Sequence, residues 1–586
     1  MRTLRIALAQ VNTSVGDIDG NAELIIEGIK AARAAGAELV AFPELAITGY
    51  PPEDLVLHRR FVADNRRALE RVAAEAHGIS AIVGFVDGSP GRDESVYNAA
   101  AFLHEGRVAA VYRKIHLPNY GVFDEERYFG RGLECPVIDF GGVRIGMSIC
   151  EDVWEPIGSA EVERAAGAEI NININASPFE RGKDGVRREL IGDMARRNQV
   201  YACYVNQVGG QDELVFDGTS LVYGPDGVLI AEGERFDEDL LVLDLDLERV
   251  ADMRSSGTWE GPSDDELAEI GFSTDLPVAR SGAVESSTVE NSTLSEPLSE
   301  EAEVYRALVL GTRDYARKTG FEKAVIALSG GIDSTLTAVI AVDALGAENV
   351  LCVALPSRYS SDGSVTDAEA LAQRLGIKLW NLPIEPAHAA FEEILEEEFR
   401  GTAAGLAEEN VQSRVRGNVI MTISNKFGYL VLTTGNKSEF ATGYATLYGD
   451  MAGGYAVIKD VPKTLVFRLC EYRNDAGPGS PIPRSVIDKP PSAELRPDQL
   501  DSDSLPPYEV LDRILERYIE DRWDAGEIIA EEVGLGGGDE ETVRGVLRLV
   551  DRNEYKRRQA PPGVKITQLA FGRDRRMPIA SRYRPH

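Results

Sequence analysis

The chain has 586 residues, 43% of them hydrophobic, and a formal net charge of −34 at pH 7. This length predicts two large domains with a sizeable core. The excess of acidic residues argues against a general nucleic-acid surface or an anionic-membrane surface, because both need exposed positive charge. Such acidity is also typical of proteins from a salt-rich cytoplasm.

The cysteines and histidines show no pattern of a disulfide or metal site. The five cysteines are scattered and include no C-x-x-C pair, and the six histidines lack metal-ligand spacing. No apolar run is long enough to cross a bilayer, and residues 1–10 read as a strand rather than a signal peptide. We therefore expect a cytoplasmic protein without membrane contact.

Residues 1–275 alternate strand-like and helix-like patterns. Short apolar runs predict buried strands at 6–9, 39–42, 81–85, 143–149, 170–175 and 201–207. Amphipathic stretches predict helices at 21–35 and 61–76, and a Pro-Asp-Gly turn predicts a hairpin at 221–230. This alternation predicts a layered α/β domain.

Three residues of this first domain suggest a catalytic set. Glu44 and Cys150 each follow an apolar strand, where α/β proteins build their sites, and Lys114 lies in a basic segment. A cysteine thiol needs a base to become a nucleophile, and Glu44 can be that base if burial raises its pKa. Lys114 would then stabilise the oxyanion of a tetrahedral intermediate. Taken alone, these residues also fit an inert core cysteine and two surface charges.

Residues 276–300 are polar, small and without periodicity, which predicts a linker to a second domain at 301–586. Apolar strands in this second domain alternate with helical stretches. They lie at 324–328, 350–356 and 378–380, and another begins at residue 430. The order predicts a doubly wound parallel sheet.

A glycine-rich turn at 329–334 (SGGIDS) connects the first of these strands to a helix. Backbone N–H groups and the helix dipole make such a turn an anion site, unless it is simply an ordinary tight turn. Ser329 and Ser334 add hydroxyl donors. Asp333 would repel a bare phosphate, and therefore indicates Mg²⁺ carried by a nucleotide. The turn lacks the Walker A pattern.

The strand that begins at residue 430 ends in a similar arrangement. Glu439 follows it after a glycine turn, so Glu439 and Asp333 would both lie at carboxyl ends of strands in one sheet. Two carboxylates suit Mg²⁺, which usually keeps several waters. Thr434 lies beside them and could hydrogen-bond ATP.

Three segments of the first domain resemble the signatures of the nitrilase superfamily: 42–45 (FPEL), 113–118 (RKIHLP) and 149–154 (ICEDVW). The resemblance implies an α-β-β-α sandwich in which Glu44, Lys114 and Cys150 hydrolyse a C–N bond through a thioester. The variant at 117–125 (LPNYGVFDE) is similar to the glutaminase domain of glutamine-dependent NAD⁺ synthetases. That similarity implies a glutamine site formed by Tyr120, Ser177 and either Arg181 or Lys183.

The turn at 329–334 resembles the loop of the ATP pyrophosphatases, whose domain is adenine nucleotide alpha hydrolase-like. The segments 410–416 (NVQSRVR), 443–454 (GYATLYGDMAGG) and 553–563 (NEYKRRQAPPG) are similar to the NAD⁺ synthetase family. The resemblance implies an ATP site at Ser329, Gly330, Gly331, Ile332, Asp333, Ser334 and Thr434. It implies contacts to deamido-NAD⁺ from Asn410, Glu439, Tyr444, Thr446, Asp450 and Lys556, with Mg²⁺ on Asp333 and Glu439.

The two resemblances together imply a ligase that hydrolyses glutamine and uses the ammonia to amidate deamido-NAD⁺ through an adenylate. Small molecules would then be its partners, and relatives of this kind are generally homo-oligomers. Because the substrates are anionic, basic residues are expected to gather in the clefts. Two alternatives are a synthetase that makes a different amide and a non-catalytic scaffold.

Overall fold

The computed structural model describes residues 2–88, 95–280, 294, 297–477, 479–497 and 499–583. It divides into two compact units, Met1–Gln211 with Val215–Pro297, and Asp212–Leu214 with Leu298–His586. Both units combine helices with β-sheets, which confirms the predicted α/β class. Most of the expected linker lies outside the described residues, and the domain bounds stay a prediction. None of the helices among the described residues has the length and apolarity needed to span a bilayer.

The first unit is built on two large sheets, ordered β14-β1-β2-β3-β4-β5 and β13-β12-β9-β8-β7-β6-β15, with a small β10-β11 ribbon. The strands of the first sheet are β1 (Thr3–Gln10), β2 (Leu39–Ala41), β3 (Ser80–Gly88), β4 (Val96–His104), β5 (Arg107–Arg113) and β14 (Asp239–Asp246). The other strands are β6 (Glu134–Phe140), β7 (Val143–Ile149), β8 (Ile170–Asn175), β9 (Tyr201–Asn206), β10 (Val208–Gln211), β11 (Leu214–Asp217), β12 (Leu221–Tyr223), β13 (Leu229–Glu232) and β15 (Phe272–Val278).

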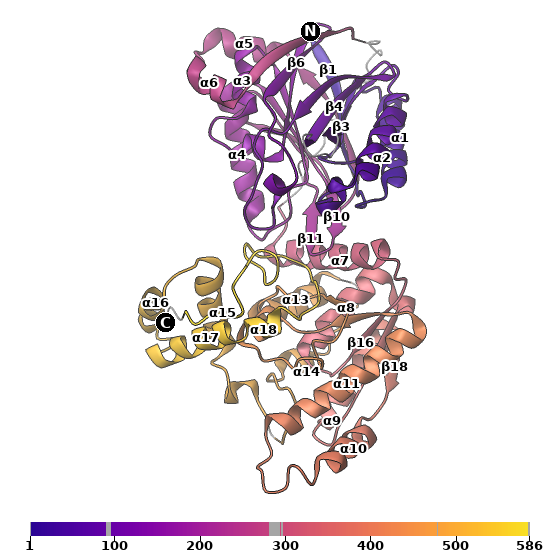
Figure 1. Cartoon of the computed structure of the whole chain (residues 1–586), viewed down its shortest axis with the longest axis vertical. Helices are drawn as coiled ribbons and strands as arrows, with labels where there is room; N and C mark the ends of the chain where they lie inside the picture. Colours follow the sequence, from indigo (N-terminus) through magenta and orange to yellow (C-terminus); the bar gives the residue numbers. More distant parts are fainter. Residues whose placement is uncertain are drawn as a thin grey trace. The chain divides into compact units, whose positions relative to one another are not determined.

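The two large sheets pack face to face with helices outside them (Figure 1). Successive residues of a strand point to opposite faces. Thus Ile6 of β1 lies in the core between the sheets, while Ala7 packs towards α1 (Ile18–Ala34) and α2 (Arg59–Ala73). On the other side, α3 (Ser159–Ala165) and α4 (Lys183–Asn198) cover the second sheet. The α-β-β-α order expected from the nitrilase resemblance is therefore confirmed.

The expected strands and the hairpin at 221–230 are present, with ends shifted by a few residues. The sequence analysis assigns no strand to β14, which pairs antiparallel with β1 along its whole length, from Thr3↔Asp246 to Gln10↔Asp239. Its partner lies more than 200 residues away in the chain, so no local pattern indicates the pairing. Strand β15 continues past the expected domain boundary at residue 275.

The second unit contains a five-stranded sheet, ordered β18-β17-β16-β19-β20, in which every pairing is parallel. Its strands are β16 (Ala324–Ala327), β17 (Val350–Ala354), β18 (Lys378–Asn381), β19 (Leu430–Thr433) and β20 (Tyr455–Ala456). The chain first moves outwards from β16 to β18 and then returns to the other side of β16. The order therefore reverses between β16 and β19, where open α/β sheets bind their ligands. The predicted doubly wound sheet is confirmed.

Helices connect and cover this sheet. They are α7 (Glu300–Lys318), α8 (Ile332–Leu345), α9 (Asp362–Leu375), α10 (Glu385–Leu395), α11 (Leu406–Phe427), α12 (Lys437–Thr442), α13 (Lys463–Ala476) and α14 (Arg484–Asp488). Val325 of β16 and Val353 of β17 pack against α11. Side chains that alternate with them, such as Ile326, point to the opposite face.

The last part of the chain forms a helical cluster with a core of its own. It comprises α15 (Tyr508–Leu515), the short turn η6 (Glu516–Glu520), α16 (Ala525–Leu535), α17 (Glu540–Arg552) and α18 (Glu554–Arg557). Helix α17 buries Val543, Val546, Leu547 and Val550, the spacing of one helix face. These side chains share a core with Phe440 of α12, so the cluster is anchored to the helix that carries Glu439.

Candidate active sites

The three residues predicted to form the first catalytic set come together from both large sheets. Glu44 follows β2, Lys114 follows β5, and Cys150 follows β7 at the start of the turn η3 (Cys150–Val153). Cys150 has a φ of +42°, a left-handed conformation that is uncommon for a residue with a side chain. Such strain is typical of active sites, because it persists only where the surroundings enforce it.

A buried ion pair joins Lys114 to two carboxylates. Its Nζ atom lies 2.7 Å from Glu44 Oε1 and 2.9 Å from Glu125 Oε1, and neither Lys114 nor Glu44 is exposed. Asn98 Nδ2 donates to Glu44 at 2.7 Å, and the Ala176 N–H donates to its other oxygen at 3.0 Å. Glu44 is therefore held rigidly.

Electrostatics keeps the thiol protonated at rest. Burial raises the pKa of Cys150 well above its ordinary value, Glu44 adds to the shift, and Lys114 opposes it. Burial lowers the pKa of Lys114, but Glu125 and Glu44 more than reverse that effect, so the ammonium stays charged. The site thus combines a neutral thiol, a fixed carboxylate and a fixed cation. Attack by the thiol requires transfer of its proton to a base.

Glu125 is a site residue that the sequence analysis missed. Burial raises the pKa of its carboxyl, and the Tyr50 hydroxyl donates to it at 2.9 Å. The residue opens the turn η2 (Glu125–Arg127) rather than following a strand, so strand-end reasoning does not find it. The only sequence signal was its position at the end of the 117–125 segment.

The residues expected to hold glutamine lie around this centre. The Tyr120 hydroxyl donates to both oxygens of Glu151, at 2.9 and 3.0 Å. Ser177 follows β8 and is buried. Glu151 directly follows Cys150 in the sequence. Like Glu125, it has no role in the sequence analysis. Burial raises its pKa.

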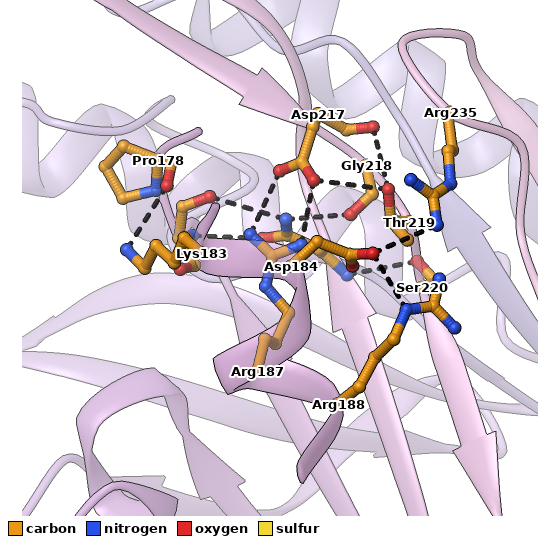
Figure 2. Close-up of polar contacts among 12 residues, drawn as sticks. Pro178, Lys183, Asp184, Arg187, Arg188, Asp217, Gly218, Thr219, Ser220 and Arg235 are labelled. Carbon is orange, nitrogen blue, oxygen red and sulfur yellow. Dashed lines mark hydrogen bonds and ion pairs between the residues drawn. The ribbon is translucent and has the colours of Figure 1, made fainter. Parts of the chain in front are cut away.

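Lys183, one of the two cations expected to hold glutamine, lies next to the predicted pocket residue Ser177. Lys183 begins α4, and its Nζ atom donates to the Pro178 carbonyl oxygen at 3.2 Å (Figure 2). Burial lowers the pKa of Lys183, and the nearby Glu180 carboxylate opposes that shift. One helical turn later, Arg187 forms a buried bidentate pair with Asp217 at 2.9 and 3.1 Å, which fixes this end of α4 (Figure 2).

The second site lies at the reversal point of the parallel sheet. Gly330 has a φ of +79°, and a Cβ atom there would lie 2.1 Å from the Ser364 carbonyl oxygen, so only glycine fits. Ser334 Oγ accepts from the Ser329 N–H at 3.2 Å and donates to the Gly331 carbonyl at 3.0 Å. Ile332 and Asp333 begin the 14-residue helix α8. The first N–H groups of a helix lack partners within it, which makes this turn suitable for an anion.

The two predicted metal ligands face one cation of the protein, Lys463 at the start of α13. Lys463 pairs with Asp333, and its Nζ atom lies 3.6 Å from Glu439 Oε1. Asn436 Nδ2 donates to Asp333 at 2.9 Å. Burial and the charge of Asp333 raise the pKa of Glu439 to about 8, although Lys463 opposes the shift. The sequence analysis missed Lys463, because a lysine after a proline carries no distinctive pattern.

These carboxylates fit Mg²⁺. Two buried like charges are destabilising, and a hard divalent cation with oxygen ligands relieves them. Among the residues that the structure describes, no three His, Cys, Asp or Glu side chains form a metal-binding group. Two carboxylates are nevertheless enough for Mg²⁺, which takes its other ligands from water and substrate phosphates.

Three of the residues expected to contact deamido-NAD⁺ form one polar network, and two others lie on or contact the same turn. Thr446 Oγ1 donates to Asn410 Oδ1 at 2.8 Å, and its N–H donates to Asp450 Oδ1 at 2.8 Å. Lys556 Nζ donates to the carbonyls of Gly443 and Ala445. Tyr444 lies on the same turn, and its hydroxyl accepts from Gln499 at 3.4 Å. Thr434 follows β19, partly exposed.

Comparison with known proteins covers both halves of the chain. A model of the carbon-nitrogen hydrolase family matches residues 5–255, and a model of the NAD synthase family matches residues 304–560. The chain is 46% identical to the glutamine-dependent NAD(+) synthetase of Thermotoga maritima, over 100% of both chains. It is 45% identical to that of Aquifex aeolicus, over 99% of this chain and 100% of the relative.

Solved structures agree with these matches. The chain is similar to a glutamine-dependent NAD+ synthetase from Acinetobacter baumannii in complex with adenosine diphosphate, with 40% identity and a TM-score of 0.73 over 100% of both chains. A likeness at 23% identity to the enzyme from Cytophaga hutchinsonii has a TM-score of 0.80, covers 99% of this chain and 98% of the other, and supports the fold alone. The resemblance seen in the sequence is confirmed, and the chain belongs to the family of glutamine-dependent NAD(+) synthetases.

Proposed function

We propose that the two sites divide one reaction, the glutamine-dependent synthesis of NAD⁺. At the first site, glutamine and water give glutamate and ammonia. At the second site, ATP, deamido-NAD⁺ and ammonia give NAD⁺, AMP and pyrophosphate. The observation that carries the proposal is the buried Lys114, which joins Glu44 and Glu125 beside a strained cysteine in a chain that matches its relatives over the full length.

In the first half-reaction, Cys150 attacks the side-chain amide carbon of glutamine while its proton moves to Glu44. An ammonium group has three N–H donors, and Glu44 and Glu125 use two of those of Lys114. The third donor stabilises the oxyanion of the tetrahedral intermediate. Glu44 then returns the proton to the leaving nitrogen, and ammonia departs. Water attacks the thioester and Glu44 takes up its proton. Glutamate leaves as Glu44 returns that proton to the Cys150 sulfur.

The glutamine substrate carries a carboxylate and an ammonium group, and the site offers groups of both signs. Lys183 is the cation we assign to the α-carboxylate, in preference to Arg181, because its Nζ atom is held at the Pro178 carbonyl, next to the predicted pocket residue Ser177. Glu151, held by Tyr120, is the anion we assign to the α-ammonium group. Ser177, which is buried at the end of β8, adds a hydroxyl to the pocket.

In the second half-reaction, the nicotinate carboxylate of deamido-NAD⁺ attacks the α-phosphate of ATP and pyrophosphate leaves. The turn from Ser329 to Ser334 holds the pyrophosphate through N–H and hydroxyl donors. Asp333 and Glu439 would hold Mg²⁺, which supplies neutralisation of phosphate charge. Lys463 adds a fixed positive charge beside these carboxylates. Ammonia then attacks the acyl carbon of the adenylate and displaces AMP.

We assign the contacts with deamido-NAD⁺ to the turn that follows α12. Thr446, Asn410 and Asp450 form a network of donors and acceptors suited to the amide-forming end of the substrate. Tyr444 lies on the same turn and offers a ring face to the nicotinate. The lysine bound to that turn, Lys556, supplies positive charge for the substrate carboxylate or phosphates.

The test is a product balance in one assay. Purified protein receives glutamine, ATP, magnesium and deamido-NAD⁺, and the release of glutamate, AMP and NAD⁺ is followed together. We expect AMP and NAD⁺ in equal amounts. A synthetase for a different amide would release AMP only with another carboxylic acid, and a scaffold would release none. Absence of NAD⁺ with all substrates present would refute the proposal.

Two further expectations concern the oligomeric state of the protein and its location in the cell. We propose a homo-oligomer in the cytoplasm, supported only by the family resemblance. Light scattering coupled to gel filtration measures the first property. Fractionation of the source cells measures the second.

A further inference from the structure

A cavity in the C-terminal helical cluster of the second unit lies outside the residues assigned to either reaction. Its volume is about 430 Å³, within the range of small-molecule sites. It is bordered by the turn η6, by the segment that leads into α16, by α17 and by the extended segment after Leu569 (the yellow helices of Figure 1).

The lining of this cavity is cationic, although the chain as a whole carries a net charge of −34. Arg522, Arg575 and Arg576 line it together with two aspartates. Both aspartates have other roles. Asp524 caps α16 by accepting the Glu527 N–H at 3.0 Å, and Asp574 lies 3.0 Å from Lys565 Nζ. The two aspartates therefore do not neutralise the positive charge of the three arginines.

The three guanidinium groups keep donors unused. Arg576 donates through Nε to the Arg573 carbonyl at 3.1 Å. Arg522 is exposed and makes no hydrogen bond or ion pair with any residue that the structure describes, and its backbone has a φ of +58°. A residue with a side chain held in this strained conformation is typical of ligand sites.

Behind the cavity, positive charge also exceeds negative charge. Arg575 shares the carboxylate of Glu554 with Arg557 and Arg558, at N–O distances of 3.4, 3.0 and 3.0 Å. Asp551 also faces Arg575 and Arg557, so three guanidinium groups and two carboxylates leave an excess of one positive charge. Burial also lowers the pKa of Arg575, because removing the charged guanidinium group from water costs free energy. A bound anion would reverse that cost.

The remaining walls are aromatic and apolar. Tyr518 donates its hydroxyl to Asp551 at 2.9 Å, so its polar end is satisfied. The guanidinium carbon of Arg517 lies 4.8 Å from the centre of the Trp523 ring. Ile519 and Leu547 complete an apolar side. A ligand that combines a flat ring with a phosphate would use both parts of the lining, because arginine binds phosphate through paired donors and rings pack on aromatic side chains.

We propose that this cavity binds a nucleoside monophosphate, with the phosphate on Arg522 and Arg576 and the base against Tyr518 and Trp523. The site is separate from the adenylation site and uses none of its residues. The proposal does not depend on the assigned reaction.

The test is hydrogen–deuterium exchange of the full-length protein with AMP as the probe, read in peptides that cover 516–525 and 569–577. Peptides that cover 329–334 report the adenylation site in the same sample. AMP is expected to slow exchange in the first two regions. In the double variant Arg522→Gln/Arg576→Gln, the AMP concentration for half-protection there should rise at least about tenfold, since each charged hydrogen bond contributes that much. Protection at 329–334 should stay unchanged.

The control variant is Arg374→Gln, an exposed arginine of α9, which should behave as the unaltered protein. Adenosine and inorganic phosphate are the two further probes, and each should protect the cavity peptides less than AMP does. Three results would overturn the proposal: no protection of 516–525 and 569–577 by AMP, protection that the double variant retains, or equal protection by phosphate alone.

Discussion

Replacement of Glu125 by glutamine tests whether a second carboxylate is needed to hold Lys114, the lysine that we propose to be catalytic. The change keeps the shape of the side chain and removes its charge. Glu125 Oε1 lies 2.9 Å from Lys114 Nζ, and both side chains are buried. With an effective dielectric constant of about 20, Coulomb's law gives roughly 6 kcal/mol for two unit charges at this distance. The neutral amide of glutamine still accepts a hydrogen bond, and it is easier to bury than a carboxylate. We therefore expect the net loss of stabilisation at Lys114 to be roughly 3 kcal/mol, which is at the low end of the cost of breaking a buried ion pair.

A loss of that size in transition-state stabilisation corresponds to about a 100-fold lower rate. We therefore expect kcat/KM for glutamate release from glutamine to fall about 100-fold in Glu125→Gln. NAD⁺ synthesis from added ammonium salts should remain, because that reaction does not use the thiol. The matched control is Glu126→Gln, whose side chain is exposed and whose loss should change neither rate. A Glu125→Gln protein with full glutaminase activity would refute the role assigned to this carboxylate.

Four further predictions concern other parts of the two sites. Cys150→Ala should lose glutamine-driven synthesis by at least about 10⁴-fold and keep the ammonium-driven rate within about twofold, and loss of both rates would contradict separate sites. Asp333→Ala should abolish release of AMP while glutamate release continues; a normal rate of AMP release would exclude its role at the phosphates. Lys183→Met should raise KM for glutamine by about 10- to 100-fold, as expected for a lost charged hydrogen bond, and Arg181→Met should leave it nearly unchanged. The opposite order would reassign the carboxylate contact. Gly330→Ala should raise KM for ATP, because its Cβ atom meets the Ser364 carbonyl at 2.1 Å, and an unchanged KM would show that the turn adapts.

The sequence was sufficient for the parts of the fold that depend on local pattern. Strand β1 and helix α1 follow from hydrophobic periodicity, and the turn after β16 follows from its glycines. The sequence did not predict the pairing of β14 with β1, because the two strands lie more than 200 residues apart and their register depends on the whole domain. The same holds for the face-to-face packing of two sheets. The nitrilase resemblance implied that packing, whereas periodicity alone did not.

Some residues of the candidate sites could also be predicted from local sequence pattern, and others could not. Glu44, Cys150 and Asp333 each follow a strand, so a general rule for α/β proteins finds them. Glu125 lies on a turn and Lys463 begins a helix, and both enter the candidate sites only through the charged groups that they face. Their signal is mutual burial, the close approach of opposite charges with almost no exposure, and burial is a property of the folded chain.

The position of the lysines explains how a strongly acidic chain can act on anionic substrates. Lys114, Lys183 and Lys463 are each largely withdrawn from solvent, and carboxylates hold two of them in place. Salt screens exposed charges beyond about 10 Å, whereas buried pairs are screened much less. Positive charge therefore acts at the two candidate sites, although the chain as a whole carries a net charge of −34. The acidic composition and the cationic chemistry are compatible because these lysines are held inside the fold, where salt screens their charges only weakly.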